Sequence, residues 1–398
     1  MRLLAMGPVA VLATLTLAAC TTEGADPGRT PAAEPPTAST ITPSTGSVTP
    51  APSSSAEPPQ TAPTSTFKLA LAGDVHFEGV LRDRLDDPAT ALAPVAEALI
   101  APDLAVVNLE TSVGSGGRPE PGKRFTFQAP PSAFAALAAA GVDIASMANN
   151  HALDHGRAPL RGTFAAIARA RIADPPLQVV GLGRDAAEAF APAVVDVHGT
   201  AVAVIGTTVA GADPTADPTG QWAATPTSAG TADALDPARL LRAVRRADRG
   251  ADVVVIYAHW GIQGQRCPSV EQRELAADLA EAGADIVIGS HAHVLQGDGL
   301  LQARGRDPYV AYGLGNFAWY TQNPATAATG ILTLTVRPPA ERAGRALVVR
   351  ADWLRLRIGS DGLPRPLPVD ESAVVAGERA DLRTCAGLRR LRDQKVDG

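Results

Sequence analysis

Short runs of apolar residues recur from Phe67 onward, and stretches with helical spacing separate several of them. Seven such runs predict buried strands: residues 67–73, 103–108, 142–148, 200–206, 252–260, 285–291 and 309–315. Four intervening segments predict helices: residues 131–141, 159–171, 236–250 and 269–283. Ser132 and Asp236 stand where an N-cap is expected, and several of the helical segments end in Gly. Alternation of this kind predicts an α/β fold with buried, largely parallel strands.

Two later segments, residues 330–337 and 346–358, alternate apolar and polar side chains. A period of two is typical of strands with one buried face, so we expect antiparallel strands there. Residues 67–370 are therefore predicted to form one domain. Residues 371–398 are expected to form a C-terminal helix or tail.

The first 66 residues predict export and tethering. MRLLAMGPVAVLATLTLAAC has an early Arg, an apolar stretch and small residues, as signal peptides do. Its last four residues resemble a lipoprotein signal over residues 1–20, in which Cys20 receives a lipid that anchors the protein to the membrane. An ordinary cleaved signal peptide, giving a secreted protein, is the alternative. Residues 21–66 are rich in Pro, Ser and Thr and predict a disordered linker.

The net charge argues against one class of partner, and the cysteine count bears on a disulfide. The net charge is −6, with no excess of Lys and Arg, so nucleic acid is not an expected partner. Besides Cys20 the chain has two cysteines, Cys267 and Cys385. An exported protein with two remaining cysteines permits one disulfide, although sequence alone does not show that the two meet.

Side chains that can bind metals follow six of the predicted strands. They are Asp74 and His76; Asn108 and Glu110; Asn149, Asn150, His151 and Asp154; His259; His291 and His293; and Asn316. Ligands of open α/β sheets bind beyond the carboxyl ends of the strands, so these side chains are expected to converge. Taken singly, each segment has a simpler explanation as a turn, a helix cap or a core position.

The pair of histidines in DIVIGSHAHVLQG (residues 285–297) is harder to explain by packing. In an extended backbone His291 and His293 would point to the same side, as two metal ligands would. Imidazole, carboxylate and carboxamide donors suit Zn, Mn, Fe or Mg, and no Cys-x-x-Cys pair suggests a thiolate zinc site. The donors exceed the need of one tetrahedral ion, which predicts two divalent metal ions sharing a carboxylate.

Six motifs in fixed order resemble the CapA family of capsule and poly-γ-glutamate biosynthesis proteins. They are GDVHFEG, VVNLETSV, SMANNHALDHG, YAHWG, GSHAHVLQG and YGLGNF, within residues 67–320. That family in turn resembles the calcineurin-like metallophosphoesterases. The resemblance implies a four-layer α/β/β/α sandwich with two mixed sheets.

The resemblance also implies a role for each site residue. One metal would be bound by Asp74, His76 and His293, the second by Asn150, His259 and His291, and both by Glu110. His151 would donate a proton to the leaving group, and Asp154 would orient a neighbouring ligand or merely begin a helix. Candidate substrate contacts are Lys123, Arg124 and Asn316; the alternatives are solvent exposure for the first two and a tight turn for Asn316.

Three functions remain open from the sequence. The first is a dinuclear hydrolase at the cell envelope, working on an anionic polymer or its precursor, with a capsule-synthesis complex as a candidate partner. The second is a phosphoesterase of small phosphate esters, which is favoured by His76 because many family members have an apolar residue there. The third is a non-catalytic scaffold for polymer tethering or export. An acidic residue common after HWG in the family is missing from residues 262–265, which leaves room for the scaffold.

Overall fold

The computed structural model describes residues 65–209, 217–304, 306–321, 323–341, 344–367 and 372–392. Cys20, the predicted signal peptide and residues 21–64 lie outside these residues, so their predicted roles stay predictions. Within the described part, no helix is long and apolar enough to cross a bilayer.

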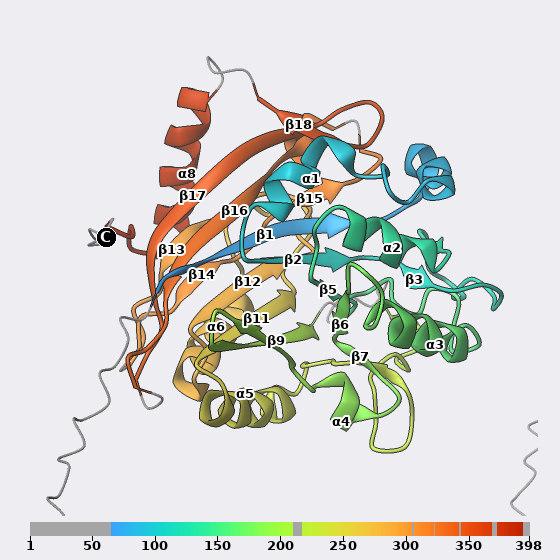
Figure 1. Ribbon diagram of the computed structural model, residues 1–398, viewed down its shortest axis with the longest axis horizontal. Coiled ribbons are helices and arrows are strands. Elements are labelled where there is room, and N and C mark those ends of the chain that lie inside the picture. Colours follow the sequence, from blue (N-terminus) through green and yellow to red (C-terminus); the bar gives the residue numbers. More distant parts are fainter. Residues whose placement is uncertain are drawn as a thin grey trace, which may run out of the picture. The chain divides into compact units, whose positions relative to one another are not determined.

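The first sheet has eight strands (Figure 1), seven of them in the order β18-β17-β16-β1-β2-β5-β6, with β15 paired to the end of β1. They are β1 (Phe67–Val75), β2 (Leu104–Leu109), β5 (Ile144–Ser146), β6 (Gln178–Val180), β15 (Asn316–Ala318), β16 (Ala328–Arg337), β17 (Leu347–Ile358) and β18 (Pro364–Pro366). Strands β1, β2, β5 and β6 are parallel. The segments with strict alternation, β16 and β17, form its antiparallel side, as predicted.

The second sheet has six strands in the order β13-β14-β12-β11-β9-β8. They are β8 (Ala193–Val197), β9 (Thr200–Thr208), β11 (Val253–His259), β12 (Ile286–Ser290), β13 (Asp298–Leu300) and β14 (Tyr309–Ala311). The four central strands are parallel, and the two edge strands are antiparallel to their neighbours.

Helices cover the outer face of each sheet. Helices α1 (Ala93–Ile100), α2 (Ser132–Ala139) and α3 (Leu160–Ala170) share a hydrophobic cluster with the first sheet. Helices α5 (Ala238–Gly250) and α6 (Val270–Ala282) do the same for the second (Figure 1). The remaining elements are short or peripheral: η1 (Gly79–Asp86), β3 (Ser112–Val113), β4 (Gln128–Ala129), β7 (Leu182–Gly183), α4 (Ala186–Ala189), β10 (Gly230–Thr231), α7 (Pro324–Ala327) and α8 (Ser372–Ala386).

A third hydrophobic cluster fills the space between the two sheets. Along strand β1, alternate side chains pack into two different layers of the core. Leu69 and Leu71 face the other sheet, whereas Ala70 and Ala72 face the helices. The Tyr257 hydroxyl on β11 donates a 2.6 Å hydrogen bond to the Ala72 carbonyl oxygen and links the sheets. These layers confirm the predicted four-layer sandwich with two mixed sheets.

Two local predictions need correction. Ser132 does not cap α2, because the helix begins at Ser132 itself and Pro131 offers no side-chain hydrogen bond. The predicted strand 309–315 ends at Ala311, and the chain then crosses to the first sheet as β15. Asp236, by contrast, accepts the Ala238 N–H at 3.1 Å, as an N-terminal capping residue does.

Helix α8 is fastened to the second sheet and its neighbours. A disulfide joins Cys385 on α8 to Cys267, so the pairing that the cysteine count permits is formed. Asp298 on β13 is buried and binds Arg379 and Arg383 of the same helix. Covalent and ionic contacts thus hold the described part of the C-terminal segment on the domain.

Candidate metal centre

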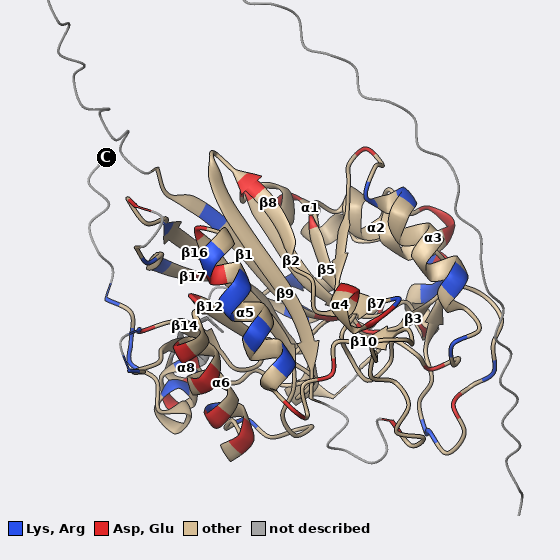
Figure 2. Ribbon diagram, turned by 90° about the horizontal axis from the view of Figure 1, so that it is seen from below, with Lys and Arg blue, Asp and Glu red and all other residues tan. Residues whose placement is uncertain are grey.

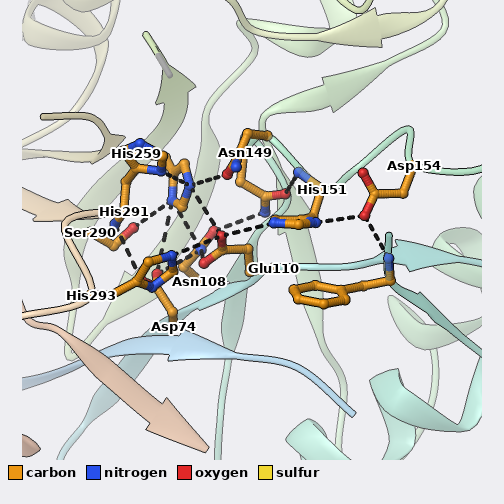
Figure 3. A network of polar contacts seen from close by, with 12 residues as sticks. Asp74, Asn108, Glu110, Asn149, His151, Asp154, His259, Ser290, His291 and His293 are labelled. Atoms are coloured by element: carbon orange, nitrogen blue, oxygen red, sulfur yellow. Dashed lines mark hydrogen bonds and ion pairs between the residues drawn. The ribbon is translucent and has the colours of Figure 1, made fainter. Parts of the chain in front are cut away.

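The carboxyl ends of parallel strands from both sheets meet at one cluster of polar side chains (Figure 3). The first sheet contributes Asp74, Asn108 and Glu110 from β1, β2 and the residue after β2. The second contributes His259 from β11 and the turn after β12. The residues predicted to converge here from distant segments therefore do lie together, with the exceptions described below.

Glu110 lies at the centre of this cluster. Its carboxylate is fully buried, and its Oε1 atom has no hydrogen-bond partner among the described residues. Around that oxygen stand the Nε2 atoms of three histidines: His259 at 3.5 Å, His151 at 3.7 Å and His293 at 3.9 Å. A buried oxygen without a hydrogen bond is costly, and these distances leave room for a cation between oxygen and nitrogen.

Two groups of donors share Glu110. One is Glu110, His259 and His291; the other is Asp74, Glu110 and His293. Within each group the donor atoms lie within 4.8 Å of one another. Asn150 adds its Oδ1 atom, 2.6 Å from His259 Nε2. This donor set, with one carboxylate common to both groups, suits divalent cations.

His76 lies beside the donors, but it belongs to neither group. Its Nδ1 atom accepts the Glu78 N–H at 2.9 Å, and its ring packs edge-on against Trp319. Its Nε2 atom is buried and has no partner among the described residues. Metal binding by His76, for which this nitrogen would be the donor, stays a prediction.

The two histidines of the His-Ala-His pair reach the cluster by a turn. Strand β12 ends at Ser290, and both His291 (φ 88°) and His293 (φ 55°) have left-handed backbones. The expectation that an extended strand aligns the two rings is therefore wrong. The His291 N–H donates to Asp74 Oδ2 at 3.2 Å, which helps to hold this uncommon conformation.

Several polar residues that received no assigned role from the sequence hold the donors in place. Asn108 donates to Asp74 Oδ1 at 2.8 Å and lies 3.2 Å from His259 Nδ1. Asn149 donates to Asn108 Oδ1 at 3.0 Å, and Ser290 lies 2.9 Å from His259 Nδ1. Their places in the sequence, within two residues of a predicted ligand, are the signal that could have identified them.

His151 and Asp154 form a pair at one side of the cluster (Figure 3). His151 Nδ1 lies 2.5 Å from Asp154 Oδ2, so its Nε2 atom faces Glu110. The Phe127 ring stacks on His151 with centroids 4.0 Å apart, and the Phe127 N–H donates to Asp154. The imidazole is therefore fixed in both position and tilt.

The three candidate substrate contacts have different environments. Lys123 is buried, bonds to Asp154 at 2.5 Å and to the Asn150 carbonyl oxygen, and lies over the Trp222 ring. Asn316 is also buried, with one end of its amide on His293 Nδ1 at 2.8 Å and the other on the Thr326 carbonyl oxygen.

The polar atoms of both residues have partners inside the protein, and their roles as substrate contacts stay predictions. The alternative of solvent exposure for Lys123 is wrong, because its side chain is buried. Arg124 is exposed and stacks on the Phe125 ring, so its role as a substrate contact stays a prediction.

Burial is the largest single influence on the pKa values of His259, His291 and His293. It lowers the pKa of His259 to about 3 and holds the pKa of His291 well below its usual value. For His293 burial is outweighed by Glu110 and Asp74, which raise the pKa to about 9. Burial, and then Asp74, raise the pKa of Glu110 well above its usual range. Two carboxylates this close repel one another, a condition that a bound cation relieves.

Burial and neighbouring charges also shift the pKa values of His151 and Asp154. Burial and then the Lys123 ammonium hold the pKa of His151 well below its usual value. Burial raises the pKa of Asp154 to about 7, although Lys123 opposes the rise. Lys123, whose pKa burial lowers, therefore has Asp154 as its counter-ion in a site that solvent hardly reaches.

Comparison with known proteins identifies the family. The sequence model described as the bacterial capsule synthesis protein PGA_cap matches residues 68–321. The chain belongs to this family. The membership predicted from six ordered motifs is thus confirmed, and the matched residues contain every predicted metal ligand.

Two relatives carry related names. The PGA biosynthesis protein CapA of Bacillus subtilis is 31% identical over 178 residues, covering 44% of this chain and 42% of that protein. The capsule biosynthesis protein CapA of Bacillus anthracis is 31% identical over 191 residues, covering 46% and 42%. The chain thus spans about two-fifths of the length of these relatives.

Among solved structures, a novel phosphatase from Mycoplasma pneumoniae is similar to this chain with a TM-score of 0.43 and 12% identity. The superposition covers 74% of this chain and 94% of the phosphatase.

Proposed function

We propose that this protein is a dinuclear metal-dependent hydrolase that works at the cell envelope on an anionic polymer or its precursor. The observation that supports this most directly is the buried Glu110 Oε1 atom, which has no hydrogen bond among the described residues and faces three histidine nitrogens. An oxygen in that setting is suited to bind cations from two sides.

The residues fit two divalent ions of the kind that mixed oxygen and nitrogen donors prefer, namely Mn, Zn, Fe or Mg. One ion would be held by Asp74, Glu110 and His293, with the free His76 Nε2 as a further donor. The other would be held by Glu110, Asn150, His259 and His291. When bound, such a pair supplies Lewis-acid activation of water and stabilises developing negative charge.

The remaining chemistry belongs to His151. Asp154 holds its Nδ1 side, so Nε2 is the atom that exchanges a proton with water and with the leaving group. Stacking by Phe127 keeps the ring at a fixed angle to Glu110. Lys123 balances the charge of Asp154 and, through the Asn150 carbonyl oxygen, positions the loop that carries His151.

The names of the relatives and the N-terminal sequence support an envelope location. Two relatives are named for capsule or PGA biosynthesis, so a carboxylate-rich polymer and a capsule-synthesis complex are the proposed substrate and partner. The predicted lipid on Cys20 would hold the domain at the outer face of the membrane, and the predicted linker would give it reach.

Turnover by the purified protein tests this proposal. Metal-loaded protein is incubated with γ-linked glutamate oligomers, and separately with chromogenic phosphate monoesters and diesters. Cleavage of the oligomer, lost in His151→Gln while bound metal is retained, is the expected result. No turnover on either substrate, despite bound metal, would contradict the proposal and support the scaffold.

Phosphoesterase activity is the second candidate. The free Nε2 atom of His76 favours it, because His76 is the ligand by which the sequence resembles the phosphoesterases rather than other family members. Cleavage of the esters without cleavage of the oligomer would establish this alternative. His76→Asn would then be expected to lower ester turnover by at least about tenfold.

A further inference from the structure

Two neighbouring helices on the outer face of the second sheet carry charged stripes of opposite sign. Helix α5 carries Arg239, Arg242, Arg246 and Arg249, and helix α6 carries Glu271, Glu274, Asp278 and Glu281. Figure 2 shows blue bands along α5 and red bands on α6. This face takes no part in the candidate metal centre.

The two stripes have the same spacing. Each helix has 13 residues, and each stripe occupies positions 2, 5, 9 and 12; α5 also carries Arg245 and Asp248, and α6 also carries Arg273. Steps of three, four and three residues keep a stripe on one side of an α-helix and make it about 15 Å long. All eight side chains are exposed except Arg239, which is half-buried.

Seven of these eight side chains have no hydrogen-bond or ion-pair partner among the described residues. The four arginines form no hydrogen bond or ion pair with another described residue, and neither do Glu274, Asp278 and Glu281. Glu271, in the first turn of α6, differs because its side chain forms a hydrogen bond with Ser269, the N-cap residue of that helix. By contrast, the arginines of α8 described above, Arg379 and Arg383, both bond to Asp298.

The two helices are also parallel neighbours. Each connects two parallel strands of the second sheet, α5 between β9 and β11 and α6 between β11 and β12, so both run in the same direction. They pack side by side over that sheet. Helix α5 ends five residues before Val255, and α6 ends four residues before Ile286, the partner of Val255 in β12. The positive and negative stripes therefore lie next to each other on one face at nearly the same level.

We propose that this face binds a second copy of the chain across a two-fold axis that runs parallel to α5 and α6, along the line between them. Such a rotation places α5 of one copy on α6 of the other and keeps the helix direction. It sets Arg242 opposite Glu274 and Arg246 opposite Asp278, with Arg239 opposite Glu271 and Arg249 opposite Glu281 at the ends. The same four pairs recur by symmetry, as an isologous interface requires.

Self-association fits these charges better than other occupants do. A polyanion or an anionic membrane would be attracted by α5, but it would be repelled by α6 directly beside it. Two helices about 20 Å long and about 10 Å apart bury on the order of 800 Å² in total, below a standard interface. The dimer is therefore weak and salt-dependent, and it forms most readily where copies are concentrated at one surface.

Sedimentation of the full chain at two salt concentrations tests the dimer. At about 20 mM salt we expect reversible dimerisation, with an association constant at least tenfold higher than at about 300 mM, where charges are screened within a few ångströms. A chain that stays monomeric at low salt up to the millimolar range would overturn the proposal.

Charge exchange between the helices separates this interface from a general effect of charge. Arg242→Glu/Arg246→Glu places two acidic side chains at the centre of the α5 stripe, opposite Glu274 and Asp278 of a second copy. Glu274→Arg/Asp278→Arg places two basic side chains at the centre of the α6 stripe, opposite Arg242 and Arg246, so each variant alone is expected to be monomeric. Mixing the two variants restores both contacts and is expected to give the heterodimer. Folded variants that fail to pair on mixing, or wild-type chains that bind polyglutamate through α5 but not each other, would refute the interface.

Discussion

The polar side chains of the candidate metal centre differ in whether all their polar atoms have hydrogen-bond partners. Asn108 and Asn316 have their amide groups bonded inside the protein and position other donors. Glu110 and His76 each keep one buried atom without a partner among the described residues. The sequence could identify all four as polar residues beside predicted strand ends, but it could not show which atoms were already used. That distinction depends on contacts between segments far apart in the chain.

Lys123 and Arg124 offer a direct test at the residue scale. Lys123→Met removes the cation that balances the buried Asp154, so the free energy of unfolding should fall by about 3 kcal/mol. Arg124→Met changes an exposed neighbour and should alter it by less than about 0.5 kcal/mol. Urea unfolding measures both. Equal effects of the two substitutions would mean that Lys123 is not a buried partner of Asp154.

Gly73 provides a second test at this scale. A Cβ atom at Gly73 would lie 1.8 Å from the Gly315 carbonyl oxygen, where the crossing between the sheets passes β1. Gly73→Ala should therefore cost at least about 2–3 kcal/mol of unfolding free energy.

Gly162 in α3 is the matched control, because nothing lies within 4 Å of its added Cβ. Gly162→Ala should raise the unfolding free energy by about 0.5–1 kcal/mol, since Ala is the better helix former. A Gly73→Ala protein as stable as wild type would contradict the close approach.

At the scale of elements, the spacing of apolar residues predicted a strand correctly where burial alone determined the backbone conformation. Buried strands and the alternating β16 and β17 follow from hydrophobic pattern alone. The pattern failed after Ala311 and after Ser290, where the chain leaves a strand at a turn. The left-handed backbones of His291 and His293 are stabilised by tertiary contacts such as Asp74, which no local pattern records.

The attachment of α8 gives a prediction at this scale. Asp298→Asn leaves Arg379 without its buried counter-ion and should lower the free energy of unfolding by about 2–4 kcal/mol. The exposed pair of Asp307 and Arg389 is the control, and Asp307→Asn should cost less than about 1 kcal/mol. Thermal unfolding compares the two.

The same contact should depend on pH in a defined direction. Burial raises the pKa of Asp298, but Arg379 outweighs it and holds the pKa below its usual value. The stability from this carboxylate is therefore present above the unfolded pKa of about 3.9 and is lost as the pH falls through the lower folded pKa. The difference between wild type and Asp298→Asn should be constant near neutral pH and shrink below about pH 4. A difference that grows on acidification would contradict this assignment.

At the scale of the whole molecule, the site exists because two sheets end at the same place. Asp74 lies near the end of β1 and Glu110 follows β2 in one sheet, and His259 ends β11 and His291 follows β12 in the other. The rule that ligands gather beyond the carboxyl ends of parallel strands was enough to predict their convergence. The sharing of Glu110 between two donor groups was expected from the family resemblance, whereas the burial of Lys123 required the packing of the sheets and loops to be known.

The number of metal ions bound per chain tests the central claim most directly. The purified protein, loaded with Mn or Zn and dialysed, should hold about two ions, and Glu110→Gln should hold fewer than one because both donor groups share that carboxylate. Glu120→Gln, at a buried glutamate that bonds to Thr219 outside the donor groups, should keep about two. A wild-type protein that binds no metal after loading, or a Glu110→Gln protein that still binds two ions, would contradict the account.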